Sequence, residues 1–215
     1  MQSSRFTSLV RQRQGDQPVA RIAVPVALGV VVGTATSFAQ AHLGLPWAAL
    51  ANSASPWLLG GFAAGAIQVR RGTAIAAGFI TCFLEVAAYY LTSSARGFPV
   101  SHAWIVFWAA CAVLGGPASG WAGWAWLRAT GWWQALGASF AASTFLAEGL
   151  GAYQLRLHHE SSAILFLVIG LTLLVIAARR ILSVALLVCT GALTVVGLVI
   201  YGPLLSVLTG TGFTG

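Results

Sequence analysis

Seven apolar stretches, each about as long as a helix that crosses a bilayer, dominate this chain and leave charged residues almost only at their edges. They cover residues 22–41, 50–69, 73–93, 102–127, 132–154, 162–178 and 181–207. This pattern predicts an all-α, polytopic transmembrane helix bundle with seven spans. Six spans would result if the last two, which only Arg179 and Arg180 separate, were counted wrongly.

Composition excludes a water-soluble domain. Of the 215 residues 58% are hydrophobic and 7% are charged, whereas a globular chain is about one quarter charged. Residues 1–20 predict a polar cytoplasmic tail, residues 21–208 a single helix-bundle domain, and residues 209–215 a short C-terminal tail. The Ala39-Gln40-Ala41 triplet resembles a signal-peptidase site, but the first apolar stretch is long for a signal peptide and predicts a retained span.

The arginines predict the orientation of the bundle. The chain has 11 of them and no lysine, and with a cytoplasmic N-terminus only Arg96 and Arg156 would lie outside. Cytoplasmic loops carry such an excess of positive charge, so the N-terminus is expected inside and the C-terminus outside, in a multi-pass protein of the inner (plasma) membrane. The net charge of +7 is thereby explained by residues that flank spans. The expected partner is the lipid bilayer, and no nucleic-acid partner is expected.

Two glutamates lie inside predicted spans, where an ionisable side chain is a functional candidate by default. At 1.5 Å per residue, Glu85 lies roughly 21 Å beyond Arg71 and Glu148 roughly 25 Å beyond Gly131, so both belong to the outer half of the membrane. Each shares a helix face with small residues, which predicts that the carboxyls point into the bundle: Gly78 and Cys82 with Glu85, and Gly137, Ala141 and Thr144 with Glu148. The alternative is a buried acid that only fixes helix orientation.

Burial in an apolar bundle penalises the charged form of a carboxyl, so these side chains are suited to donate a proton near neutral pH. Two neighbouring helices would then provide a general acid and a general base. The sequence decides neither whether Glu85 and Glu148 meet nor which of them donates the proton.

Aromatic and polar side chains at the same depth predict a binding pocket. Five of the nine tryptophans flank Arg128 and fit the interfacial belt, whereas four others fall at the level of the glutamates. Their rings can line a pocket for an apolar ligand or stabilise a carbocation. We expect Glu85 and Glu148 to be catalytic, and we expect the substrate to contact Tyr89, Tyr90, Asn52, Trp57, His102, Trp104, Trp108 and Thr144.

Neither a metal nor a cofactor is expected. The single aspartate, Asp16, lies outside the apolar region, so the carboxylate cluster of a magnesium–diphosphate site is missing. His158-His159-Glu160 lacks the spacing of a helical ligand pair. The three cysteines, Cys82, Cys111 and Cys189, lie in apolar stretches and are predicted to be packing thiols.

Three local patterns carry further expectations. The segment Asn52-Ser53-x-Ser55-Pro56-Trp57 predicts a helix start capped by Ser53 or Ser55, whose free amides would suit an anionic or carbonyl group; the alternative is a plain junction. Gly115-Gly116-Pro117 predicts a kink or a break into two half-helices. The small residues Gly29, Gly33 and Ser37 are suited to docking a partner.

The Asn52–Trp57 segment, the Tyr89-Tyr90 pair after Glu85 and the overall size resemble an uncharacterised family of actinobacterial multi-span proteins, over most of residues 20–205. That resemblance implies no activity. More loosely, the chain is similar to small integral-membrane terpene cyclases of bacterial indole-terpenoid pathways in span number and in dispensing with aspartate-rich metal motifs.

These features predict an integral-membrane terpene cyclase, an isomerase or lyase of terpenoid biosynthesis. It would carry out acid-initiated cyclisation of a lipid-soluble prenyl chain in an aromatic pocket open to the outer half of the bilayer. The alternative is a small-molecule binding or transport subunit, similar in size to the substrate-capture subunits of vitamin importers. A third interpretation, a structural bundle without a ligand, predicts that neither glutamate matters. The substrate and the oligomeric state stay open.

Overall fold

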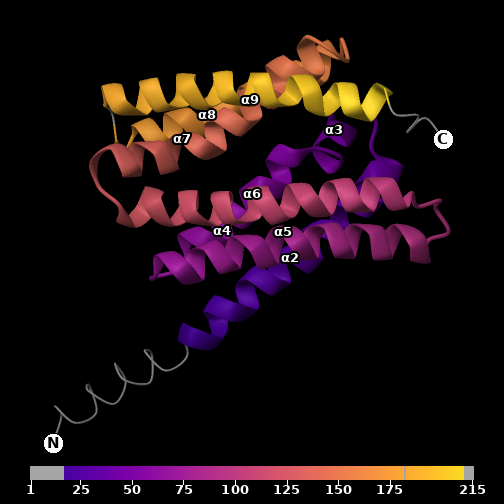
Figure 1. Cartoon of the computed structure of the whole chain (residues 1–215), viewed down its shortest axis with the longest axis horizontal. Helices are drawn as coiled ribbons and strands as arrows, with labels where there is room; N and C mark the ends of the chain where they lie inside the picture. The colour runs from indigo at the N-terminus through magenta and orange to yellow at the C-terminus, as the bar shows by residue number, and fades with distance from the viewer. Residues whose placement is uncertain (1–16, 182, 211–215) are drawn as a thin grey trace, which may run out of the picture.

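The computed structural model describes residues 17–181 and 183–210, and this part of the chain is helical throughout, without strands (Figure 1). The predicted all-α architecture is therefore confirmed. Most of the two predicted tails lies outside the described residues, but residues 17–20 are already helical. The elements are α2 (Gln17–His42), α3 (Trp47–Ala51), α4 (Ala54–Ala66), α5 (Arg71–Ala95), α6 (His102–Arg128), α7 (Gly131–Glu148), the π-helix η1 (Gly149–Gln154), α8 (Glu160–Ala178) and α9 (Val184–Gly210).

Within the part of the chain that the structure describes, five segments are long and apolar enough to cross a membrane: Ala20–His42, Arg71–Ala95, His102–Arg128, Glu160–Ala178 and Val184–Tyr201. Their outward faces are apolar, with Ile22 70%, Leu114 76% and Val184 77% exposed. Large apolar side chains that are exposed to this extent suit contact with hydrocarbon rather than with water. The chain is a helical membrane bundle in contact with lipid.

The second predicted span is not one helix. Residues 50–69 are divided between α3 and α4, because Ser53 has an extended backbone (φ −142°, ψ 149°) that separates the two. Helix α4 has 13 residues and is therefore about 20 Å long, short of the roughly 30 Å hydrocarbon core. The expectation of a continuous helix over this stretch is wrong.

Helix α6 runs unbroken from His102 to Arg128 with Pro117 inside it. The predicted division into two half-helices at Gly115-Gly116-Pro117 is therefore wrong. The neighbouring helix explains the continuity, because a Cβ atom on Gly116 would lie 2.9 Å from the carbonyl oxygen of Gly78 on α5. Close packing against a neighbour holds the helix together where proline removes a backbone hydrogen bond.

Helices α2, α4, α5 and α6 form one layer of the bundle, and α7, α8 and α9 form the other (Figure 1). Within the first layer α5 packs against α2, α4 and α6, and within the second α7 packs against α8 and α9. Contacts of α4 and α6 with α7 join the layers. The candidate site lies along this seam.

Glycine brings the helices of the first layer close together. A Cβ atom on Gly120 would meet the carbonyl oxygen of Ala74 and the backbone of Gly78, so α5 and α6 touch through their backbones. Gly33 of α2 likewise lies against the backbone of Glu85, and the Ser37 hydroxyl is hydrogen-bonded to that of Ser93 at 2.8 Å. The expectation that the small residues of α2 dock a partner is wrong, since they are used within the chain to bind α5.

Candidate functional site

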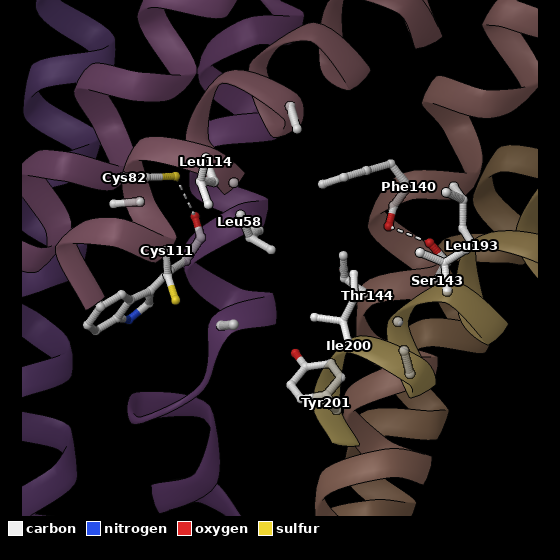
Figure 2. A pocket seen from close by; sticks show the side chains of 18 of the residues that line it. Leu58, Cys82, Cys111, Leu114, Phe140, Ser143, Thr144, Leu193, Ile200 and Tyr201 are labelled. Carbon is white, nitrogen blue, oxygen red and sulfur yellow. Dashed lines mark hydrogen bonds between the residues drawn. The ribbon is translucent and has the colours of Figure 1, made fainter. Parts of the chain in front are cut away.

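A cavity of about 440 Å³ lies in the seam between the two layers. Its first wall comes from α4, α5 and α6 and its second from α7 and α9, which face each other across the gap in Figure 2. Among the described residues that line it, none carries a charge, and the polar side-chain atoms belong to hydroxyls, thiols and indole N–H groups. The first wall includes Ala54, Trp57, Leu58, Cys82, Val86, Trp108, Cys111 and Leu114, and the second Phe140, Ser143, Thr144, Ala147, Val196, Ile200 and Tyr201.

Three of the residues predicted to contact substrate line this cavity: Trp57, Trp108 and Thr144. The two indole rings pack together with centroids 5.3 Å apart. Tyr89 lies behind Trp57 at 5.6 Å and stacks edge-on against Tyr90 at 5.0 Å. The four rings form one aromatic cluster, of which the two tryptophans face the cavity.

The other predicted contact residues lie elsewhere among the described residues. Asn52 and His102 are exposed, the first between α3 and α4 and the second at the start of α6. Trp104 packs edge-on against Phe107, with centroids 5.9 Å apart. The prediction that these three side chains line the pocket is therefore wrong, since they are not among the described lining residues.

Glu148 is held at the N-terminus of α4. Its carboxyl oxygens accept hydrogen bonds from the amides of Ala54 (3.2 Å) and Ser55 (2.9 Å) and from the Ser55 hydroxyl (2.5 Å). The first amides of a helix have no partner within it and favour an acidic group. Helix α4 begins at this segment with Ser53 at its N-cap position, as predicted, but the predicted cap by a serine side chain is wrong, because the Glu148 carboxyl from another helix accepts from those amides.

Tyr201 connects Glu148 to the cavity. Its side chain lies on the α9 wall (Figure 2), close to both Glu148 and Ser55. Glu148 itself is not among the described lining residues, so the phenol stands between the carboxyl and the space. The sequence analysis missed Tyr201, although it is the one tyrosine of the last predicted span.

The π-helix η1 explains how the Asn52–Trp57 segment is held. In a π-helix the backbone bonds join residues five apart, so Glu148 and Tyr153 turn toward the same neighbour. The Tyr153 hydroxyl is hydrogen-bonded to the Ser53 hydroxyl at 2.5 Å. Ser53 directly precedes Ala54 and Ser55, whose amides donate to Glu148. Both serines of the motif are therefore fixed by the end of α7 and η1.

Glu85 has different surroundings. Its side chain is fully buried where α2, α4 and α5 meet, with one carboxyl oxygen against Gly60. Both carboxyl oxygens lack a hydrogen-bond partner among the described residues. Glu85 does not line the cavity, but Cys82 and Val86 on the same helix do. An ionised carboxylate would be uncompensated here.

His158 and His159 are exposed just before α8, and Glu160 is the exposed first residue of that helix. Within the described ranges, no group of three histidine, cysteine, aspartate or glutamate side chains is placed to hold a metal ion.

Comparison with known proteins gives one finding. The model of a family of unknown function, DUF6518, matches residues 12–207, which confirms the predicted resemblance to an uncharacterised family and carries no activity with it. No curated protein and no solved structure matches the chain.

Proposed function

Because the chain belongs to DUF6518, whose function is unknown, we propose a function from its own geometry: it binds an apolar small molecule, of the size of a short prenyl chain, in the cavity between its two layers. The observation that carries this proposal is an uncharged cavity of about 440 Å³ within a membrane bundle. Ligand pockets commonly have volumes of roughly 300–1,000 Å³ and mostly apolar walls. A cavity of this kind fits both functions predicted from the sequence, the small-molecule binding protein and the terpene cyclase, equally well.

The side chains of the wall support an apolar ligand further. The hydroxyls of Ser143 and Thr144 donate to the carbonyls of Phe140 and Ala141 on their own helix, both at 2.9 Å. They therefore present little hydrogen-bonding capacity to the cavity. Trp57 and Trp108 add broad apolar faces.

Filling the cavity is expected to abolish binding. In phosphatidylcholine vesicles, a farnesol that carries a photoreactive diazirine and an alkyne tag should label the cavity walls of the wild-type chain. Thr144→Trp should lower that labelling at least fivefold because the indole occupies the space. Thr172→Trp is the matched control, since Thr172 makes the same kind of bond to its own helix but is exposed on α8. Equal labelling of the two variants would contradict the proposal.

Acid-initiated cyclisation of the bound prenyl chain is the second candidate, and the link from Glu148 through Tyr201 to the cavity favours it. In this reaction a proton adds to an alkene or epoxide, the next double bond closes a ring on the cation, and a base removes a proton. Trp57 and Trp108 would stabilise the cation through their faces. The net change is an isomerisation that consumes no oxidant or reductant. Glu85, on α5 of the first layer, is the second candidate proton donor: it is fully buried and has no hydrogen-bond partner among the described residues.

Cyclisation can be tested with farnesylated acceptors and membranes that hold the chain. We expect a cyclised product, and we expect Glu85→Gln or Glu148→Gln to lower its rate about a hundredfold or more, because general acid–base catalysis typically contributes 10²–10⁴-fold. Glu160→Gln, at the exposed start of α8, is the control. Unchanged rates in both glutamine variants would exclude acid catalysis by these residues. A retained ligand without turnover, together with a co-purifying ATPase, would instead favour the capture-subunit function.

We also propose that the chain crosses the plasma membrane seven times, with α3 and α4 together making the second crossing, and that its N-terminus is cytoplasmic. Contacts among arginine-bearing segments at one end of the bundle support this orientation. Arg128 donates to the carbonyl of Ala66 at 2.6 Å, the Arg180 guanidinium lies 5.6 Å from the centre of the Trp126 ring, and Gln68 donates to the carbonyl of Arg21.

Thiol labelling of intact cells tests the orientation. In a cysteine-free background, Ser94→Cys and Ser161→Cys should react with a membrane-impermeant maleimide from outside. Thr130→Cys should react only after the cells are opened. All three positions are exposed, so accessibility depends on the side of the membrane. The reverse pattern would overturn the orientation.

A further inference from the structure

The cavity opens toward lipid between α6 and α9. Leu114 and Ala118 of α6 and Val196 and Ile200 of α9 line it, yet Leu114 is 76%, Val196 58% and Ile200 55% exposed on the outer surface of the bundle. Residues that face both the cavity and the outside mark its mouth. In the described chain α6 and α9 do not form a packed helix pair, so this mouth is a gap between two lipid-facing helices.

The two ends of the cavity differ in chemistry. The mouth is formed by aliphatic side chains alone, which offer nothing to an ion or a strongly hydrated molecule. At the outer end, Ala54 and Tyr201 bring the cavity next to the Glu148 carboxyl. A molecule that fills the cavity therefore meets mostly apolar side chains along its length and the Tyr201 hydroxyl at its tip.

The hydrogen bonds at that tip define what it can recognise. The Ser55 hydroxyl already donates to Glu148 at 2.5 Å, and the Tyr201 side chain lies close to the same carboxyl. When the phenol donates its single proton to the carboxyl, its oxygen is left as an acceptor. A ligand suited to this acceptor carries a donor such as a hydroxyl group.

We propose that the ligand is a single-chain lipid alcohol that enters sideways from the bilayer between α6 and α9 and donates its hydroxyl hydrogen to Tyr201. This inference rests on the proposed ligand binding and adds the route and the chemical class. The size of the cavity limits the chain to a short isoprenoid or acyl alcohol, and the aliphatic mouth admits it without passage through water.

The polar tip is tested with a pair of probes. Diazirine–alkyne farnesol and its O-methyl ether differ only in the hydrogen that the alcohol can donate. In phosphatidylcholine vesicles the alcohol should label peptides 108–118 and 193–201 at least fivefold more than the ether. Tyr201→Phe should remove that preference, because phenylalanine leaves no acceptor. Equal labelling by the two probes in the wild-type chain would overturn the assignment to an alcohol.

The lateral route is tested with tryptophan at the mouth. Leu114→Trp should slow labelling from vesicles at least threefold, whereas Val113→Trp, on the same helix but not lining the cavity, should leave the rate unchanged. The elution profile in detergent verifies that both variants fold. Equal rates would overturn the lateral route while leaving ligand binding intact. If neither probe labels the cavity, the binding proposal itself is overturned. Cross-links between two chains across the mouth would show that a second copy covers it, which would overturn the lateral route.

Discussion

Glu148→Ala is expected to lower the free energy of unfolding of the bundle by about 3 kcal/mol or more, which is a larger loss than we expect for Gly78→Leu below. The change leaves the amides of Ala54 and Ser55 and the Ser55 hydroxyl without their acceptor inside the membrane. An unsatisfied buried polar group costs about 1–3 kcal/mol, and three are created together. Glu148→Gln should cost less, because the amide oxygen can still accept. Unfolding of the purified protein by sodium dodecyl sulfate in mixed micelles measures the difference.

The control for this prediction is Glu160→Ala. Glu160 is exposed in the first turn of α8, so its loss should cost less than about 1 kcal/mol through the helix dipole. Equal stability of the wild-type chain and Glu148→Ala would show that the Glu148 contacts to α4 contribute nothing to folding.

Gly78→Leu is expected to separate α5 from α6. A side chain at Gly78 would meet the backbone of Gly116 and Gly120, and a backbone cannot move aside as a flexible side chain can. Overpacking of a buried site costs about 1–3 kcal/mol and occasionally more, and this contact between two backbones belongs at the upper end. The same detergent unfolding, together with the folded yield from membranes, measures the loss.

Gly72→Leu is the matched control on the same helix, where a Cβ atom meets nothing within 4 Å. It should fold as well as the wild-type chain, apart from small changes in helix propensity. If Gly78→Leu tolerated detergent equally well, the close approach of α5 and α6 would not be needed for the fold.

The helical membrane architecture could be predicted because it depends on local properties of the chain. Span length, the rarity of charge and small residues at helical spacing are all visible in the sequence, and Gly78, Cys82 and Glu85 are buried together on α5 as their spacing indicated. Trp57, Trp108 and Thr144 reached the cavity for the same reason, since depth along a helix follows from residue number.

The rest depends on pairing between distant segments, which spacing along one helix does not specify. The sequence could not show that Glu148 reaches the first amides of α4, or that Tyr201 approaches it from the last helix. Pro117 could not be recognised as an internal residue of α6, because the close packing of α5 beside it is not visible in the sequence. Asn52, His102 and Trp104 do not line the cavity, because the side on which a residue lies follows from which distant segments pack against it.

The distance in sequence between α4 and Glu148 has a consequence for biosynthesis. Ninety-four residues separate Ala54 from the carboxyl that accepts its amide hydrogen, so α4 leaves the ribosome long before its acceptor is made. Until α7 has been inserted, the start of α4 can satisfy its donors only with water or lipid headgroups at the membrane surface. The start of α4 can therefore gain its final hydrogen-bond acceptor only after α7 has been made and has packed beside it.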